Sequence, residues 1–136
     1  MILDLSHGVR LHRVTHKSVN EATNPTTAPK VAMAELGNVL PRLIHAVATA
    51  DDAKGPILFS KLDIKDGYWR MVVPAADEWN FAYVLPKEHP GEPTRLVVPS
   101  SLQMGWCDSP AYFCAASKTA RDIGEHLSTS QPIGSL

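Results

Sequence analysis

One acidic side chain, Asp63, follows an apolar run, Ile57–Leu62, that is typical of a buried strand. Charged side chains are rarely buried without a partner or a metal ion, so a carboxylate at the tip of such a strand needs a reason. One reason is a divalent cation, which carboxylate oxygens bind. Another is that Asp63 caps the turn that Asp66 and Gly67 introduce. Taken alone, the run favours the cap.

A second motif lies before the most strongly patterned helix of the sequence. Ser109 as N-cap and Pro110 at the first helical position predict a helix start. Apolar residues then recur at steps of three and four as far as Leu127, which predicts a long amphipathic helix. The turn just before it, Leu102–Trp106, contains Gly105.

A short basic stretch near the N-terminus contains Arg10, Arg13 and Lys17. These side chains suit contact with a phosphate backbone, although a solvated loop explains them slightly better. His12 and His16 have a spacing that suits a metal on a helix, but no cysteine or carboxylate ligand lies close in the sequence. We therefore expect no zinc site there.

Composition indicates one modest globular domain. The chain has 136 residues, 44% of them hydrophobic and 20% charged, and a formal net charge of −1. This charge gives no global attraction to nucleic acid, so any such binding must be local. Cys107 and Cys114 do not form a disulfide framework, which favours an intracellular, reducing compartment. No apolar run has the length of a membrane span, and we expect no membrane partner.

The remaining pattern predicts an α+β fold. An apolar stripe over 31–50 predicts a helix that kinks or restarts at Pro41. Short β-prone pieces, 72–73, 79–85 and 95–98, follow, with a hairpin loop over 87–94. Met1–Leu5 is a strand that begins abruptly, so we expect residues upstream of it. We divide the chain into a strand-and-loop segment (1–30), a main segment (31–127) and a polar tail (128–136).

Two stretches together resemble the palm of reverse transcriptases, particularly those of retrotransposons and retroviruses. Phe59–Tyr68 (Phe-Ser-Lys-Leu-Asp-Ile-Lys-Asp-Gly-Tyr) resembles the first catalytic motif of that family. Leu102–Phe113 (Leu-Gln-Met-Gly-Trp-Cys-Asp-Ser-Pro-Ala-Tyr-Phe) resembles the motif that lines the nucleotide pocket and opens the long palm helix. Ile2–Ser6 with Asn20 resembles part of the fingers. The resemblance covers residues 1–127 and implies a partial fingers–palm fold, with a small antiparallel sheet packed on two main helices.

The resemblance implies a role for each matching residue. Asp63 matches the catalytic carboxylate that binds both divalent ions, Mg²⁺ or Mn²⁺. Tyr68 matches an aromatic residue beneath the incoming sugar, where a ring excludes a ribose 2′-hydroxyl; its alternative is a core tyrosine. The nucleotide-binding positions as a whole are Ile64, Lys65, Asp66, Gly67, Tyr68, Met104 and Gly105. Asp66 is better explained as a helix cap, and Trp106 and Phe113 as core residues. Met104 stands where many relatives have Gln or Phe, and its thioether offers apolar contact and only a weak hydrogen-bond acceptor.

The activity implied is RNA-directed DNA synthesis from a template–primer and deoxynucleoside triphosphates. The family's later aromatic-x-Asp-Asp turn has no counterpart here, and two adjacent metal ions need several carboxylates. We therefore predict that the 136-residue chain does not polymerise by itself and that downstream polymerase segments are missing. Two alternatives stay open: a non-catalytic nucleic-acid-binding remnant and an unrelated α+β interaction domain. The polymerase interpretation requires Asp63 and Gly105 to face a shared cavity.

Overall fold

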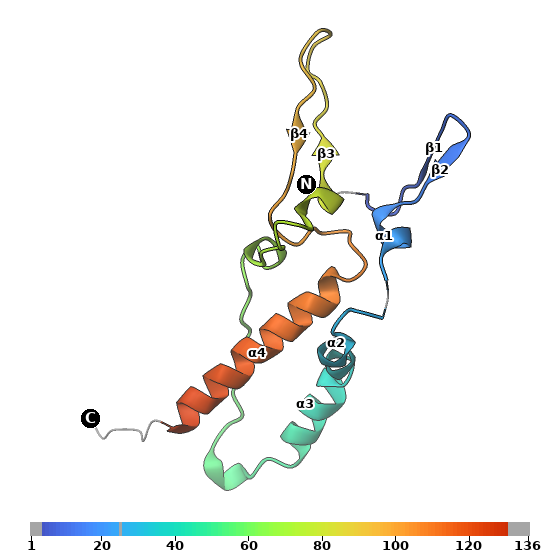
Figure 1. Ribbon diagram of the computed structural model, residues 1–136. Helices are drawn as coiled ribbons and strands as arrows, with labels where there is room; N and C mark the ends of the chain where they lie inside the picture. Colours follow the sequence, from blue (N-terminus) through green and yellow to red (C-terminus); the bar gives the residue numbers. More distant parts are fainter. Residues whose placement is uncertain (1–3, 25, 131–136) are drawn as a thin grey trace. The chain divides into compact units, whose positions relative to one another are not determined.

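The computed structural model describes residues 4–24 and 26–130 (Figure 1). The predicted α+β class is confirmed, since four α-helices accompany two antiparallel two-stranded sheets within these residues. The predicted strand at Met1–Leu5 falls largely outside them, as does most of the polar tail. The chain forms two compact units that are interleaved in sequence: unit 1 comprises 1–27 and 66–109, and unit 2 comprises 28–65 and 110–136.

Two hairpins and a short helix begin the description of unit 1. Strand β1 (Val9–Leu11) pairs with β2 (Val14–His16), and β3 (Tyr83–Val84) pairs with β4 (Leu96–Val97). Both residues of the β1–β2 turn have positive φ, 47° at His12 and 66° at Arg13, as a two-residue turn matched to strand twist requires. Helix α1 (Val19–Ala22) follows the first hairpin.

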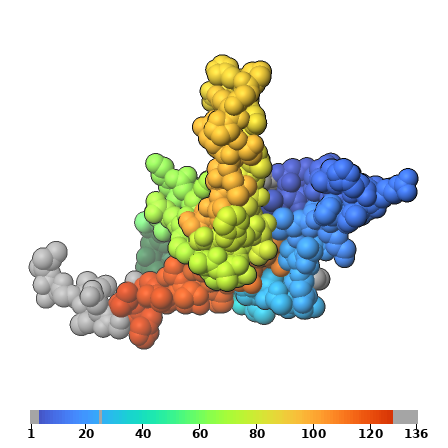
Figure 2. Space-filling view, turned by 45° about the horizontal axis from the view of Figure 1, so that its top comes forward, coloured from blue at the N-terminus to red at the C-terminus, as the bar shows by residue number. Residues whose placement is uncertain are grey.

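The second hairpin agrees with the sequence prediction in its loop and departs from it at its start. The loop over 87–94 is confirmed, because the Leu85 N–H donates to the Arg95 carbonyl oxygen at 2.9 Å and closes the hairpin. The hairpin projects from the surface (Figure 2). Residues 79–81, predicted as strand, instead belong to the 3₁₀ helix η3 (Glu78–Phe81). Phe81 is buried there, so a single turn of helix satisfies its side chain without a strand.

Unit 2 contains helices α2 (Lys30–Leu36) and α3 (Val39–Ala48), the 3₁₀ helix η1 (Asp52–Lys54) and nearly all of α4 (Ser109–Ser130). The predicted helix over 31–50 forms, but it breaks at Gly37–Asn38 and not at Pro41. Proline removes the bond to the carbonyl four residues earlier, which is that of Gly37, and is tolerated in a first turn. The chain therefore restarts its helix just before Pro41.

Helices α2 and α4 pack together in unit 2. The Nζ of Lys118 lies 3.4 Å from an Oε of Glu35, which ties one helix to the other. Lys118 also pairs with Asp122 at 3.2 Å, one turn further along α4. These carboxylates raise the pKa of Lys118, with the hydrogen bond to Asp122 as the largest cause.

The predicted buried strand over 57–64 is wrong. These residues contain no helix, strand or turn, and Leu58 and Leu62 are 86% and 91% exposed. A strand is stabilised by pairing with a neighbour. Within the described part of the chain, no backbone group of 57–64 makes a hydrogen bond to another backbone group. The apolar run favours a strand by its composition, but a strand also needs a neighbouring strand to pair with.

Candidate functional site

Several long-range hydrogen bonds hold the turn that precedes α4, in unit 1. An antiparallel pairing leads into it: the Leu102 N–H donates to the Met71 carbonyl oxygen and the Val73 N–H to that of Ser100, both at 2.9 Å. Val73 and Leu102 are each only 6% exposed. The turn follows at once, and Gly105 within it has φ 105°, a conformation that favours glycine.

This pairing places two groups of predicted nucleotide-binding residues at one end. In an antiparallel pair, residues preceding one segment lie beside residues following the other. Asp66, Gly67 and Tyr68 precede Met71, while Met104 and Gly105 follow Leu102. Both groups belong to unit 1, so the pairing brings these five candidates to the same end of one structural element.

Asn20 holds the turn in place. Its Nδ2 donates to the Gly105 carbonyl oxygen at 3.0 Å and to the Ser6 hydroxyl oxygen at 2.9 Å. Its Oδ1 accepts from the Cys107 N–H at 2.8 Å. One carboxamide therefore fixes a carbonyl and an amide on either side of Trp106, and it connects the turn to the N-terminal segment. This role of Asn20 was not foreseen, although the residue matched the fingers motif.

Helix α1 presents Asn20, and a capping box begins that helix. The Ser18 hydroxyl accepts from the Glu21 N–H at 3.2 Å, and the Ser18 N–H donates to a carboxylate oxygen of Glu21 at 2.9 Å. The bond from the Ser18 backbone is the largest cause of a lowered pKa at Glu21. The spacing Ser-x-x-Glu is a known sign of a helix start, so it was the signal that could have located α1.

Trp106 is held on two sides. Its indole N–H donates to the Thr23 hydroxyl oxygen at 2.8 Å, and its ring meets Phe81 edge-on, with 5.3 Å between ring centroids. The hydrogen bond and the aromatic contact both fix the ring within unit 1. Trp106 itself is half-buried, so its assignment as a core residue stays a prediction.

The start of α4 is buried and differs from the sequence prediction. The helix begins at Ser109, whose hydroxyl donates to the Gln103 carbonyl oxygen at 2.7 Å. Ser109 thus anchors the helix to the preceding turn and is not the N-cap. Asp108, before it, is 4% exposed, and its Oδ2 has no hydrogen-bond partner within the described residues. A negative charge beside a helix N-terminus is favoured by the helix dipole.

Tyr68 opens a single turn of 3₁₀ helix, η2 (Tyr68–Arg70), and is half-buried. Gly67 occupies the N-cap position, and no side chain caps the turn. The capping role preferred for Asp66 is therefore not observed. Asp66 instead has φ 57°, a left-handed conformation that aspartate tolerates better than most residues. This residue bends the chain just before the helical turn that contains Tyr68.

Asp63, Ile64 and Lys65 belong to unit 2, whereas the other predicted nucleotide-binding residues belong to unit 1. Asp63 is exposed, as is Ile64 at 50%. A buried carboxylate in need of a partner was the original argument for a metal at Asp63, and that burial is not observed. Its candidacy therefore depends on its position in the resembling motif alone.

The chain does not bring together the ligands for a pair of divalent ions around Asp63. Two adjacent ions need several carboxylates, and no group of three or more potential ligands within 4.8 Å includes Asp63 in the described residues. The residues present therefore do not fit the two-metal site that the resemblance implies.

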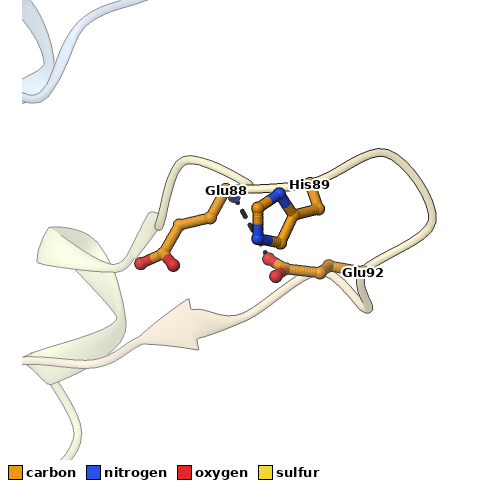
Figure 3. A group of neighbouring side chains, drawn as sticks. All are labelled: Glu88, His89 and Glu92. Carbon is orange, nitrogen blue, oxygen red and sulfur yellow. Dashed lines mark hydrogen bonds between the residues drawn. The ribbon is translucent and has the colours of Figure 1, made fainter.

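One group of potential metal ligands does come together, in the β3–β4 loop (Figure 3). Atoms of Glu88, His89 and Glu92 all lie within 4.8 Å of one another. Two carboxylate oxygens with one imidazole nitrogen suit a transition metal such as zinc. A simpler role is also visible, because the Glu88 N–H donates to Glu92 Oε2 at 3.1 Å across the loop. This bond stabilises the Pro90-Gly91 turn.

The predicted nucleic-acid-binding residues lie on the β1–β2 hairpin. Arg10 is opposite Thr15 in the pair, and Lys17 follows on the same face because side chains alternate along a strand. Arg13 lies in the turn. The other face presents Val9, Leu11 and Val14, which are 40–56% exposed. Within the described residues, neither arginine makes an ion pair with a carboxylate.

Comparisons with protein-family models, curated proteins and solved structures find no match for this chain. Among the described residues, no helix combines the length and apolar character needed to cross a membrane.

Proposed function

We propose that this chain is a fingers–palm segment of a reverse transcriptase of the retrotransposon or retroviral type. Its parent activity is RNA-directed DNA synthesis on a template–primer from deoxynucleoside triphosphates. The proposal starts from the two ordered motifs, Phe59–Tyr68 and Leu102–Phe113. Either motif alone is weak evidence, because short patterns recur by chance.

One structural observation carries the proposal furthest. Because Met71–Val73 pairs antiparallel with Ser100–Leu102, the residues Asp66–Tyr68 and Met104–Gly105 adjoin the same end of this pair. These stretches, 36 residues apart in sequence from Tyr68 to Met104, are the ones that the resemblance assigns to the nucleotide. A chance match of motifs does not require its two halves to converge.

The residues of unit 1 would then act on the nucleotide in distinct ways. The ring of Tyr68 would lie against the sugar and exclude a 2′-hydroxyl. Gly105, which has no side chain, would let the backbone approach the base or template closely. Asn20 would fix the Gly105 carbonyl through the 3.0 Å hydrogen bond.

Nucleotide discrimination tests this proposal. We expect the 136-residue chain to bind dATP more tightly than ATP by isothermal titration in MgCl₂. Tyr68→Ala should remove that preference, whereas Tyr68→Phe, which keeps the ring, should retain it. Failure to bind either nucleotide, or a preference that Tyr68→Ala leaves unchanged, would overturn the proposal.

Primer extension tests the predicted inactivity of the isolated chain. The purified protein should not extend an RNA-templated DNA primer in Mg²⁺ or Mn²⁺, because Asp63 alone does not supply the required ligands. Extension above a no-enzyme control would contradict this.

Spin labels at Cys107 and at Ser60→Cys, in a Cys114→Ser background, test whether Asp63 and Gly105 face a shared cavity. A narrow distance distribution that changes with dATP supports it, and a broad, unresponsive one opposes it.

The first hairpin favours a second candidate, a nucleic-acid-binding remnant without catalysis. Arg10 and Lys17 share one hairpin face with Thr15, and Arg13 stands at the tip. Each phosphate contact contributes roughly 0.7–0.9 to the slope of log affinity against log salt. If Arg10, Arg13 and Lys17 bind phosphate, replacing all three with Ala should reduce this slope by about 2–3 for a primer–template. Lys54→Ala, on η1, is the matched control and should leave the slope unchanged.

A further inference from the structure

The segment 57–64 is the most exposed apolar stretch of unit 2. Exposed fractions are 45% at Ile57, 86% at Leu58, 66% at Phe59, 91% at Leu62 and 50% at Ile64. It follows η1 in the chain, and no helix, strand, turn or bend is assigned to its residues. A contiguous apolar surface of this kind marks an interaction site more often than a solvated loop.

The backbone of this segment is also available for pairing. Within the described residues, none of its N–H or C=O groups takes part in a backbone hydrogen bond. Isoleucine and phenylalanine favour the pleated, half-buried environment of a sheet. A strand with unpaired polar groups and an apolar face is a template for another strand.

The charges of the segment are complementary to themselves. Lys61 and Asp63 flank Leu62 symmetrically. If two copies pair antiparallel with Leu62 opposite Leu62, then Lys61 of each copy lies opposite Asp63 of the second copy. This register makes two cross-strand pairs of opposite charge, and each such pair stabilises a sheet.

The same register also segregates the side chains. Because successive residues point to opposite faces, Leu58, Ser60, Leu62 and Ile64 lie on one face and Phe59, Lys61 and Asp63 on the other. Ser60 lies opposite Ile64 of the second copy, so the two chains together form one apolar face. Phe59 lies opposite Lys65 of the second copy, where a cation can contact the ring. The pair ends at Asp66, whose φ of 57° leaves the extended region.

Other registers lose these contacts. Centring the pair on Lys61 or on Asp63 places like charges opposite each other, which is destabilising. Parallel, in-register pairing stacks lysine on lysine and aspartate on aspartate. Shifting by one residue moves the apolar set of one strand to the opposite face. The complementary charges therefore select an antiparallel pair centred on Leu62.

We propose that segment 57–64 pairs with the same segment of a second copy of this chain, antiparallel and centred on Leu62. The occupant of the exposed strand is then a second copy, and the complex is a symmetric dimer. This inference does not depend on the proposed polymerase function, because neither nucleotide nor metal takes part. Its failure and that of the nucleotide proposal are therefore separate results.

A charge exchange tests the register by sedimentation velocity over a range of protein concentrations. Lys61→Asp and Asp63→Lys each convert both attractive pairs into repulsive ones. We expect each variant alone to dimerise on the order of tenfold more weakly than the unaltered chain. An equimolar mixture of the two should dimerise again, because each strand then presents one charge sign to the other. The double variant K61D/D63K should also recover.

Disulfide formation tests the centre of the pair in a Cys107→Ser/Cys114→Ser background. Leu62→Cys places two thiols directly opposite, within the Cα separation that a disulfide spans. Mild oxidation should cross-link it into a dimer. Ser60→Cys, on the same face, is the control: its two copies lie about 13 Å apart along the strands and should not cross-link.

Several results would overturn the dimer. These are a monomer at every concentration reached, equal cross-linking of Leu62→Cys and Ser60→Cys, and single charge variants that associate as well as the unaltered chain. Open-ended growth without a dimer plateau would do so too. Circular dichroism of each variant confirms that its helices are intact, so that a lost dimer is not a lost fold.

Discussion

The two motifs of this chain fold in opposite ways. The turn before α4 is held at both ends by buried residues: Leu102, Gln103, Asp108 and Ser109 are each at most 6% exposed, whereas Met104 between them is 37% exposed. The segment 57–64 has comparable or greater apolar content, yet every apolar side chain in it is at least 45% exposed. The difference lies in bonding partners: Asn20, Thr23 and Met71 make hydrogen bonds to the turn, whereas no backbone hydrogen bond holds the segment within the described residues. Apolar composition therefore gives a stretch the capacity for burial, and long-range hydrogen bonds and neighbours decide whether it is buried.

The largest expected effect comes from truncating one leucine in each motif. Leu102→Ala should destabilise unit 1 by about 2–4 kcal/mol, because it removes a buried side chain and leaves a cavity. Leu62→Ala should change stability by less than about 0.5 kcal/mol at protein concentrations where the chain is monomeric. Unfolding in urea reports both, since Trp69, Trp79 and Trp106 all lie in unit 1 and circular dichroism follows the helices of unit 2. Equal losses would abolish the contrast.

Asn20→Ala tests how much of the contrast is due to a single side chain. The substitution removes hydrogen bonds to Ser6, Gly105 and Cys107, and each contributes about 1 kcal/mol. We expect a loss of about 2–3 kcal/mol by tryptophan fluorescence, with faster amide exchange at Cys107. Asn80→Ala is the control, because the Asn80 side chain makes no hydrogen bond within the described residues. A loss as large at Asn80 would show that the three hydrogen bonds of Asn20 do not set this side chain apart.

Gly105→Ala separates the strain of the turn from its hydrogen bonds. Gly105 and Gly91 have similar backbone angles, φ 105° and 95°. Alanine is disfavoured at both, and we expect Gly105→Ala to cost about 1–3 kcal/mol. Gly91→Ala should cost less than half of that, since its Cβ would meet no atom within 4 Å and the exposed loop can relax. Equal costs would mean that the turn is no more rigid than the loop.

Sequence patterns predicted the elements of this fold better than their burial. The step pattern to Leu127 located α4, and Pro90-Gly91 located the second hairpin loop. These features depend on residues close in sequence. The fate of 57–64 depends on whether another strand lies beside it, which no local pattern encodes.

The candidate site shows the same division. The turn at Gly105 was predicted from its own sequence, but its attachment to Asn20 joins residues 85 apart. A side-chain amide that bonds to distant backbone groups leaves no local sequence pattern. Only the capping box of α1, which carries Asn20, could be predicted from the sequence. The geometry relating Asp63 to Gly105 stays a prediction.

The smallest effect expected is a pH dependence that acts on the turn from a distance. Ser18 lowers the pKa of Glu21 below its unfolded value, so this carboxylate stabilises unit 1 above the unfolded pKa. That contribution is lost as the pH falls through the lowered folded pKa of Glu21. Tryptophan-detected stability should therefore fall with acidification less steeply in Glu21→Gln than in the unaltered chain. Glu78→Gln, a carboxylate of η3 that accepts no hydrogen bond in the described residues, is the control.

Amide exchange shows where this acid effect is felt. Glu21 caps α1, and α1 presents Asn20 to the turn, so protonating Glu21 should loosen the Cys107 amide before the rest of unit 1 unfolds. The segment 57–64, which lacks such bonds, should exchange at the same rate on either side of this pH range once intrinsic exchange is corrected. If Cys107 kept its protection while Glu21 titrated, the capping box and the hydrogen bonds of Asn20 would be independent. The rigidity of the turn would then come from the pairing of Met71–Val73 with Ser100–Leu102.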